Sequence, residues 1–205
     1  TTEIKASAGE KSAVCKVTVS DPADFEITDG VLTAYNGKDT KVSVPSGVKE
    51  IASGAFSKAT AVTELTIPEG VTSIAAKAFS GMNALETLNL PASLKTVGSD
   101  GTWFGEMLVN VSSTGTPQAT PAKLTAVNVA EGGSTYSSAD GVVYSADAST
   151  LIYCPAVKMS IKFSDKTTAI DKYAFYKSSI EKMELPDSLE TIGKMAFMTS
   201  AVRYL

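Results

Sequence analysis

A segment of about 23 residues recurs along this chain with the same apolar positions, and this repetition limits the possible folds more than any other feature. VSVPSGVKEIASGAF at Val42–Phe56 aligns with LTIPEGVTSIAAKAF at Leu65–Phe79, so that proline, valine, isoleucine, alanine and phenylalanine recur 23 residues apart. A third copy, LNLPASLKTVG, begins at Leu88. Two later copies lie 22 residues apart: IKFSDKTTAIDKYAF at Ile161–Phe175 and MELPDSLETIGKMAF at Met183–Phe197. A unit of this size cannot bury its apolar face alone, so neighbouring units must stack.

Each unit has the pattern of a short strand followed by two further short segments. Leu65 to Ile67 alternates between apolar and polar residues, which predicts a strand with two side chains facing in and one facing out. Pro68 ends this strand because it cannot donate to a ladder of hydrogen bonds. Val71 and Ile74 indicate an irregular or second extended segment that points apolar atoms inward. The Ala-Phe pair that ends at Phe79 is expected to open a short helical stretch.

The stacked units predict a solenoid of the α/β repeat class. Units of 22–23 residues would contribute short parallel strands on one side and short helical turns on the other, interrupted by β-hairpins. The phenylalanines that close the units should be buried, each against the equivalent position of an adjacent unit: Phe56, Phe79, Phe175 and Phe197.

The repeated pattern L-x-x-L-x-L-P-x-x-L-x-x-I-x-x-x-A-F resembles the BspA-type leucine-rich repeats of bacterial surface proteins. The resemblance covers about Asp24 to Leu205, including a weaker copy, LTAVNVAEG, at Leu124–Gly132. It implies a leucine-rich-repeat solenoid at the bacterial cell surface or outside the cell. It also implies attachment to a host extracellular-matrix or cell-surface protein or glycan, to mucosal surfaces or to other bacteria.

The first 20 residues have a different pattern, with two alternating strands and a turn at Gly9-Glu10. They resemble the closing hairpin of a group 2 bacterial immunoglobulin-like domain. We therefore expect residues 1–20 to belong to an incomplete Ig-like domain and residues 21–205 to form the solenoid, in two blocks of about 21–132 and 133–205. The repeat that begins near Ala201 stops partway, so we expect the chain to be a fragment of a longer protein.

Two Asp-Gly sequences interrupt the array. FEITDGVLTAYNGKDTKVSVP contains Asp29-Gly30, with Asn36-Gly37 as a further turn candidate, and YSSADGVVYSADASTLIYCP contains Asp140-Gly141. Asp-Gly favours the tight turn of a β-hairpin, so each sequence is expected to start one block of repeats with a hairpin. Asp140 and Asp147 are interpreted as turn residues, because the spaced carboxylates of calcium loops are absent.

The third repeat is expanded. After Val97, the expected Ala-Phe pair is replaced by Trp103-Phe104, and Trp103 is expected in the core. The polar segment Asn110 to Pro121 follows, and we expect it to protrude as a mobile surface loop.

Composition argues against catalysis. The chain has no histidine, which removes serine–histidine and cysteine–histidine nucleophilic systems and the usual zinc sites. Cys15 and Cys154 lie in apolar runs and are interpreted as buried hydrophobic residues, although a disulfide remains the alternative. A net charge of −4 with a single arginine, Arg203, does not favour nucleic acid as a partner. No cofactor, metal or transmembrane segment is expected.

Outward-facing residues of the predicted strands form two columns along the sheet. Charged members in the carboxy-terminal block would steer the encounter with a ligand, which favours that block as the contact. The leading hypothesis is therefore a non-catalytic adhesion or recognition module, with a structural spacer or stalk, or a carbohydrate-binding accessory module, as alternatives. The candidate partner-binding residues are Ser43, Glu64, Thr66, Thr87, Asn89, Asn128, Lys162, Lys182 and Glu184.

Overall fold

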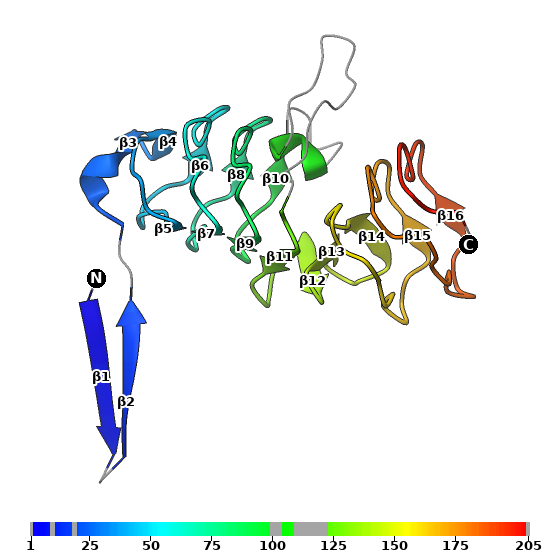
Figure 1. Cartoon of the computed structure of the whole chain (residues 1–205), viewed down its shortest axis with the longest axis horizontal. Coiled ribbons are helices and arrows are strands. Elements are labelled where there is room, and N and C mark those ends of the chain that lie inside the picture. Colours follow the sequence, from blue (N-terminus) through cyan, green and yellow to red (C-terminus); the bar gives the residue numbers. More distant parts are fainter. Residues whose placement is uncertain (1, 9–10, 18–19, 99–103, 109–122, 204–205) are drawn as a thin grey trace.

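The computed structural model describes residues 2–8, 11–17, 20–98, 104–108 and 123–203. The described residues from 20 to 203 follow a solenoid path in which the repeats form successive turns, and these turns stack along the long axis of the molecule (Figure 1). The predicted fold class, a solenoid of stacked repeats with short parallel strands, is confirmed.

The first strands of the amino-terminal units form one parallel sheet, hydrogen-bonded in the order β11-β9-β7-β5. The register follows the sequence period, so that Val42 lies beside Leu65 and Leu65 beside Leu88. The strands are short because the proline after each of the first three cannot donate a ladder hydrogen bond. Their bounds are β5 Lys41–Ser43, β7 Glu64–Thr66, β9 Thr87–Leu90 and β11 Ala126–Val129.

The second extended segment of each unit is also a strand, which the sequence left open. These strands form a second sheet in the order β10-β8-β6-β4-β3, which begins with an antiparallel hairpin and continues in parallel. The bounds are β3 Phe25–Thr28, β4 Val31–Tyr35, β6 Glu50–Ile51, β8 Ser73–Ile74 and β10 Thr96–Val97. Before it, a short 3₁₀ helix spans Pro22–Asp24.

The carboxy-terminal block contains a five-stranded sheet in strand order β12-β13-β14-β15-β16. The first three strands are antiparallel, and the last two continue in parallel as the second strands of their units. The bounds are β12 Tyr136–Ala139, β13 Val142–Ser145, β14 Thr150–Tyr153, β15 Ala169–Ile170 and β16 Thr191–Ile192.

Both predicted Asp-Gly hairpins are confirmed, and their turns have nearly the same backbone geometry. The φ angles are 50° at Asp29 and 79° at Gly30, against 50° at Asp140 and 73° at Gly141. Positive φ at both central residues is the requirement of a tight hairpin turn, which Asp-Gly meets. At Gly141 a side chain would also meet the β carbon of Ala126 at 2.8 Å, so the second hairpin packs tightly on β11.

The amino-terminal segment forms the predicted pair of strands, β1 (Thr2–Ala8) and β2 (Lys11–Val17). They pair in antiparallel fashion as a sheet of their own, separate from the sheets of the solenoid (Figure 1). The predicted turn at Gly9-Glu10 lies outside the described residues.

The expected short helical stretch after each Ala-Phe pair is wrong in its detail, because these segments are tight turns. Backbone hydrogen bonds such as Ala59 N–H to the Phe56 carbonyl span three residues. Two positions after three of the phenylalanines, the residue has a positive φ: Gly81, Lys177 and Thr199. A residue in this left-handed conformation does not fit a right-handed helix, so the turn cannot extend into one.

Aromatic rings stack along the core in the amino-terminal block. Phe56 and Phe79 are fully buried, with ring centroids 5.6 Å apart, and Tyr35 continues the row at 5.6 Å from Phe56. In the carboxy-terminal block, the buried Phe175 stacks on Phe197 at 5.0 Å.

The expectation of full burial is correct for three of the four phenylalanines and wrong for Phe197, which is half-buried. The physical reason is that no further described turn packs on the outer side of this last repeat.

The expected substitution of Trp103-Phe104 for the Ala-Phe pair is wrong. The Phe79 N–H donates to the Met107 carbonyl at 2.8 Å, as the Phe56 N–H donates to the Ala78 carbonyl, so Met107 takes the alanine position. Met107 lies in a 3₁₀ helix, Phe104–Met107, in which Phe104 packs on two tyrosines of the next block. Trp103 and the predicted loop Asn110 to Pro121 lie outside the described residues.

Replacing Phe79 by alanine is expected to lower the free energy of unfolding by about 3–5 kcal/mol, because it leaves a cavity beside the buried ring of Phe56. Urea denaturation monitored by circular dichroism measures this loss. Phe197→Ala is the matched control and should cost less, since that ring is only half-buried. Equal losses in the two variants would contradict the stacking of the core.

Candidate functional site

One polar residue on each first strand faces outward in register with its neighbours, and three of these residues form a hydrogen-bonded row. Ser43, Thr66, Asn89 and Asn128 are register partners on neighbouring strands. The side-chain amide of Asn128 donates to Oδ1 of Asn89 at 3.0 Å, and that of Asn89 donates to the hydroxyl of Thr66 at 3.2 Å. These three residues, the amide row, thus span three strands, and their hydrogen bonds hold the donors and acceptors in fixed positions.

A second outward row lies two residues earlier on the same strands and contains Lys41, Glu64, Thr87 and Ala126 in register. Lys41 and Glu64 form an ion pair of 2.7 Å between their nitrogen and oxygen atoms. Their hydrogen bond raises the pKa of Lys41, and the attraction of the carboxylate adds to the shift. The two rows are linked, because the amide of Asn89 also approaches Glu64 at 3.5 Å.

A hollow of about 390 Å³ lies where these strands end. Thr66, Asn89 and Asn128 line it together with Pro68 and Pro91, and the prolines end the ladder there. Glu69, also in the lining, accepts hydrogen bonds from the backbone of the next turn at 2.7 and 3.2 Å. The hollow is therefore bordered by the amide row and by a turn whose backbone is held by hydrogen bonds to Glu69.

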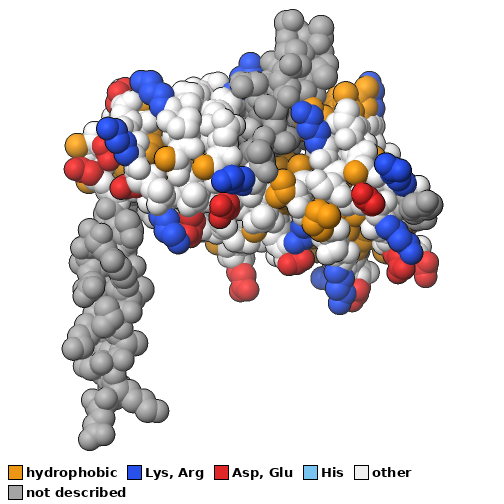
Figure 2. Space-filling view, viewed as in Figure 1, with side chains coloured by type: hydrophobic (Ala, Val, Ile, Leu, Met, Phe, Trp, Pro, Cys, Tyr) orange, Lys and Arg blue, Asp and Glu red, His pale blue; other side chains and the backbone are white. Residues whose placement is uncertain are grey.

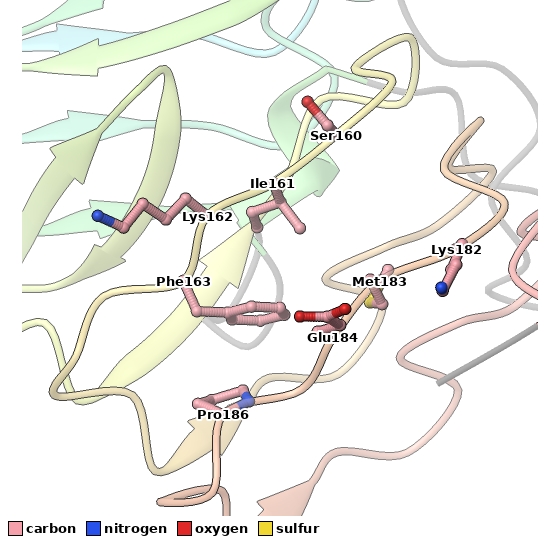
Figure 3. A pocket seen from close by; sticks show the side chains of 8 residues that line it. All are labelled: Ser160, Ile161, Lys162, Phe163, Lys182, Met183, Glu184 and Pro186. Carbon is pink, nitrogen blue, oxygen red and sulfur yellow. The ribbon is translucent and has the colours of Figure 1, made fainter.

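The predicted residues of the carboxy-terminal block do not continue this sheet. Lys162, Lys182 and Glu184 lie exposed in extended segments, and no ladder joins these segments to each other among the described residues. A cavity of about 400 Å³ separates them instead. Figure 3 shows its eight lining side chains: Ser160, Ile161, Lys162, Phe163, Lys182, Met183, Glu184 and Pro186.

The candidate residues therefore form two separate groups. Ser43, Glu64, Thr66, Thr87, Asn89 and Asn128 share the amino-terminal sheet. The other three, Lys162, Lys182 and Glu184, surround the second cavity. The separation could not be read from the repeat pattern, because the pattern gives both groups the same position in the unit.

Surface charge is mixed. Figure 2 shows lysine and acidic side chains interspersed over one face of the molecule. Large apolar side chains exposed in the described part of the chain are aliphatic or methionine, and Met159, at 72%, is the most exposed.

Asp147 acts as a turn residue, as predicted, and Asp140 has the positive φ of a hairpin turn. Asp147 accepts hydrogen bonds from the hydroxyl of Ser145 at 2.6 Å and from the backbone N–H and hydroxyl of Ser149 at 3.1 and 2.8 Å. These bonds, that from Ser145 first, lower the pKa of Asp147 from 3.8 to about 2. Within the described ranges, no three ligand side chains gather in a way that could hold a metal ion.

Cys154 is a buried free thiol, in agreement with its interpretation as a small apolar residue. Burial raises the pKa of the Cys154 thiol to about 12. A thiol with so high a pKa is protonated near neutral pH and is a poor nucleophile. No described helix is long and apolar enough to span a bilayer.

The BspA-type leucine-rich-repeat region matches this chain in six copies, over residues 33–107 and 149–204. The chain belongs to this family. The stretch between the two matched ranges contains the end of the expanded repeat, the weaker copy at Leu124–Gly132 and the second hairpin.

Solved structures with similar folds include PcpA, a pneumococcal vaccine antigen, with 31% sequence identity and a TM-score of 0.58. The alignment covers 78% of this chain and 36% of that one, so the chain spans about a third of the length of PcpA. A leucine-rich-repeat protein from Bacteroides ovatus is 20% identical, with a TM-score of 0.48, over 99% of this chain and 57% of that one. A leucine-rich cell surface protein from Faecalibacterium prausnitzii is 17% identical, with a TM-score of 0.42, over 98% and 56%. The comparison with curated proteins gave no match.

From the sequence, we predicted neither the hollow beside the amide row nor the cavity in the carboxy-terminal block. One signal for the cavity was nevertheless present. Phe163 stands where other BspA-type units of this chain have Val44, Ile67 and Leu90, and Ser164 follows it in place of proline. A larger side chain at this inward position requires more space between turns.

The stability that Asp147 contributes is expected to decrease at acid pH. Because folding lowers its pKa, this stability is present above about pH 4 and is lost as the pH falls through about 2. The difference in thermal midpoint between the unmodified protein and Asp147→Ala should therefore shrink over that interval. Asp147→Asn is the control, because its amide oxygen accepts hydrogen bonds but does not titrate. A constant difference between pH 5 and pH 2 would disprove the assignment.

Proposed function

We propose that this chain is a non-catalytic recognition module of a bacterial cell-surface protein. It binds an extended host matrix protein, cell-surface protein or glycan across the sheet β5-β7-β9-β11. The observation that supports this most strongly is the amide row Asn128, Asn89, Thr66, which presents equivalent polar groups from successive strands. A surface location fits the family and the likeness to PcpA, an antigen.

Repetition along the sheet suits a ligand that is itself extended. Neighbouring strands of a sheet lie about 4.8 Å apart, so a ligand that crosses the strands meets a polar group at each step. Weak contacts of this kind add up when one molecule makes several of them at once. The hollow beside Thr66, Asn89 and Asn128 offers room for side groups of such a ligand.

The proposal also covers residues 1–20 and the non-catalytic role. We infer that residues 1–20 are the closing hairpin of an Ig-like domain that precedes the repeats. The absence of histidine supports a non-catalytic role, because the commonest general base is missing. The buried, protonated thiol of Cys154 agrees with this role.

A spacer is the second candidate, and the continuous parallel ladder of the amino-terminal block favours it. Strands in register over four successive turns give a stiff rod that could hold another domain away from the cell. A spacer needs no ligand, so binding experiments separate the two functions.

Binding to a panel of purified matrix proteins, mucins and arrayed glycans is expected to depend on the sheet face. Asn89→Arg combined with Asn128→Arg breaks the amide row and fills the hollow, and should reduce the affinity for the partner at least tenfold, a loss of about 1.4 kcal/mol. Surface plasmon resonance measures this change.

The matched control is Thr60→Arg combined with Asn83→Arg, which adds the same charge at exposed turn positions ahead of β7 and β9. This control should bind normally. Equal loss in both double variants would point to net charge instead of the face, and a panel without any binder would leave the spacer as the function.

A further inference from the structure

In the carboxy-terminal block, the first extended segments of two neighbouring turns do not pair, whereas the equivalent strands of the amino-terminal block do. By sequence, Ile161–Phe163 and Met183–Leu185 correspond to β5 and β7, which pair in register. In the described part of the chain, no backbone hydrogen bond joins these two segments. On the other side of the same two turns, β15 and β16 do pair. The turns are therefore joined on one side and separated on the other by a gap, which is the groove between Ile161–Phe163 and Met183–Leu185.

Burial of the inward side chains shows that the gap is open to solvent along Ile161–Phe163, whereas Met183 of the other wall is buried. Val42 in β5 and Val44 directly after it are 1% and 4% exposed. The corresponding Ile161 and Phe163 are half-buried, although Phe163 still packs against Phe175 with a centroid distance of 6.2 Å. Apolar side chains that are inward elsewhere thus line an accessible wall here.

The gap combines three features that a peptide strand requires. Among the described residues, it has two extended walls whose backbone groups lack partners across it, about 400 Å³ of space, and apolar positions that alternate with charged ones. Figure 3 shows Phe163 and Glu184 pointing toward each other from opposite walls, while Lys162 extends outward at the rim. Lys162 and Lys182 outnumber Glu184, and neither lysine forms an ion pair with another described residue.

We propose that this groove binds an extended peptide segment of a partner protein, which inserts as a strand between Ile161–Phe163 and Met183–Leu185. The inserted backbone completes the hydrogen bonds that the ladder lacks, as in strand addition at a sheet edge. Its apolar side chains, every second residue, meet Ile161, Phe163 and Met183. An acidic side chain meets the two lysines.

A peptide is favoured over a glycan because the described backbone groups of the two walls have no partner across the groove, and another backbone matches such groups at regular spacing. The proposal rests on the proposed recognition function, and it specifies the class of partner and a site separate from the amide row.

The test uses the whole chain and a displayed library of random 12-residue peptides. Enriched sequences are expected to alternate apolar residues and to carry at least one acidic residue. Lys162→Glu combined with Lys182→Glu should weaken their binding about tenfold. Lys166→Glu combined with Lys194→Glu makes the same charge change at exposed lysines outside the groove and should have no effect. Equal thermal midpoints would show that both double variants fold.

Methylation of alternate backbone nitrogens in an enriched peptide separates strand pairing from side-chain contact. It should abolish binding, because a methylated nitrogen cannot donate, and the unmodified peptide should shift the NMR amide signals of Lys162 and Phe163. Failure to enrich any peptide, binding that tolerates methylation, or shifts located elsewhere would each overturn the proposal. If a matrix or glycan partner still bound through the amide row, the proposed function would stand without this groove.

Discussion

Parallel pairing between successive turns is the interaction on which the rest of this structure depends. A unit of about 23 residues has too little apolar surface for a core of its own, so its stability comes from the turns on either side. Pairing in register also aligns equivalent side chains. Phe56 therefore meets Phe79 inside the solenoid, and Asn89 meets Thr66 outside it. The same ladder thus builds the core and the proposed binding face.

The sequence predicted those features that follow from the period alone. Strand register, the inward valines and leucines, and the two Asp-Gly hairpins were all predicted, because each depends on local chemistry or on the repeat. The tight turns that replace the expected helical stretches were not predicted, because positive φ at residues such as Lys177 and Thr199 is not evident from their side chains. The position of Met107 depends on how the expanded repeat folds back onto Phe79, which spacing does not reveal.

The candidate site follows the same division. The two outward rows of the amino-terminal sheet could be predicted from alternation, but the amide chain that joins Asn128 to Thr66 and the hollow beside it depend on side-chain conformation. In the carboxy-terminal block, the repeat pattern predicts a closed ladder, and the structure has a groove. Phe163 and Ser164 mark the change, because they depart from the small apolar residue and proline of the other units.

Amide hydrogen exchange, measured residue by residue by NMR, tests most directly whether the ladder is closed in one block and open in the other. The Val44 and Ile67 amides donate to carbonyls of the next turn at 3.0 and 2.9 Å, so they should exchange slowly. The equivalent amide of Phe163 has no such acceptor in the described structure and should exchange close to the rate of an unfolded peptide. Protection of Phe163 equal to that of Val44 would show that the ladder closes there and would contradict the account.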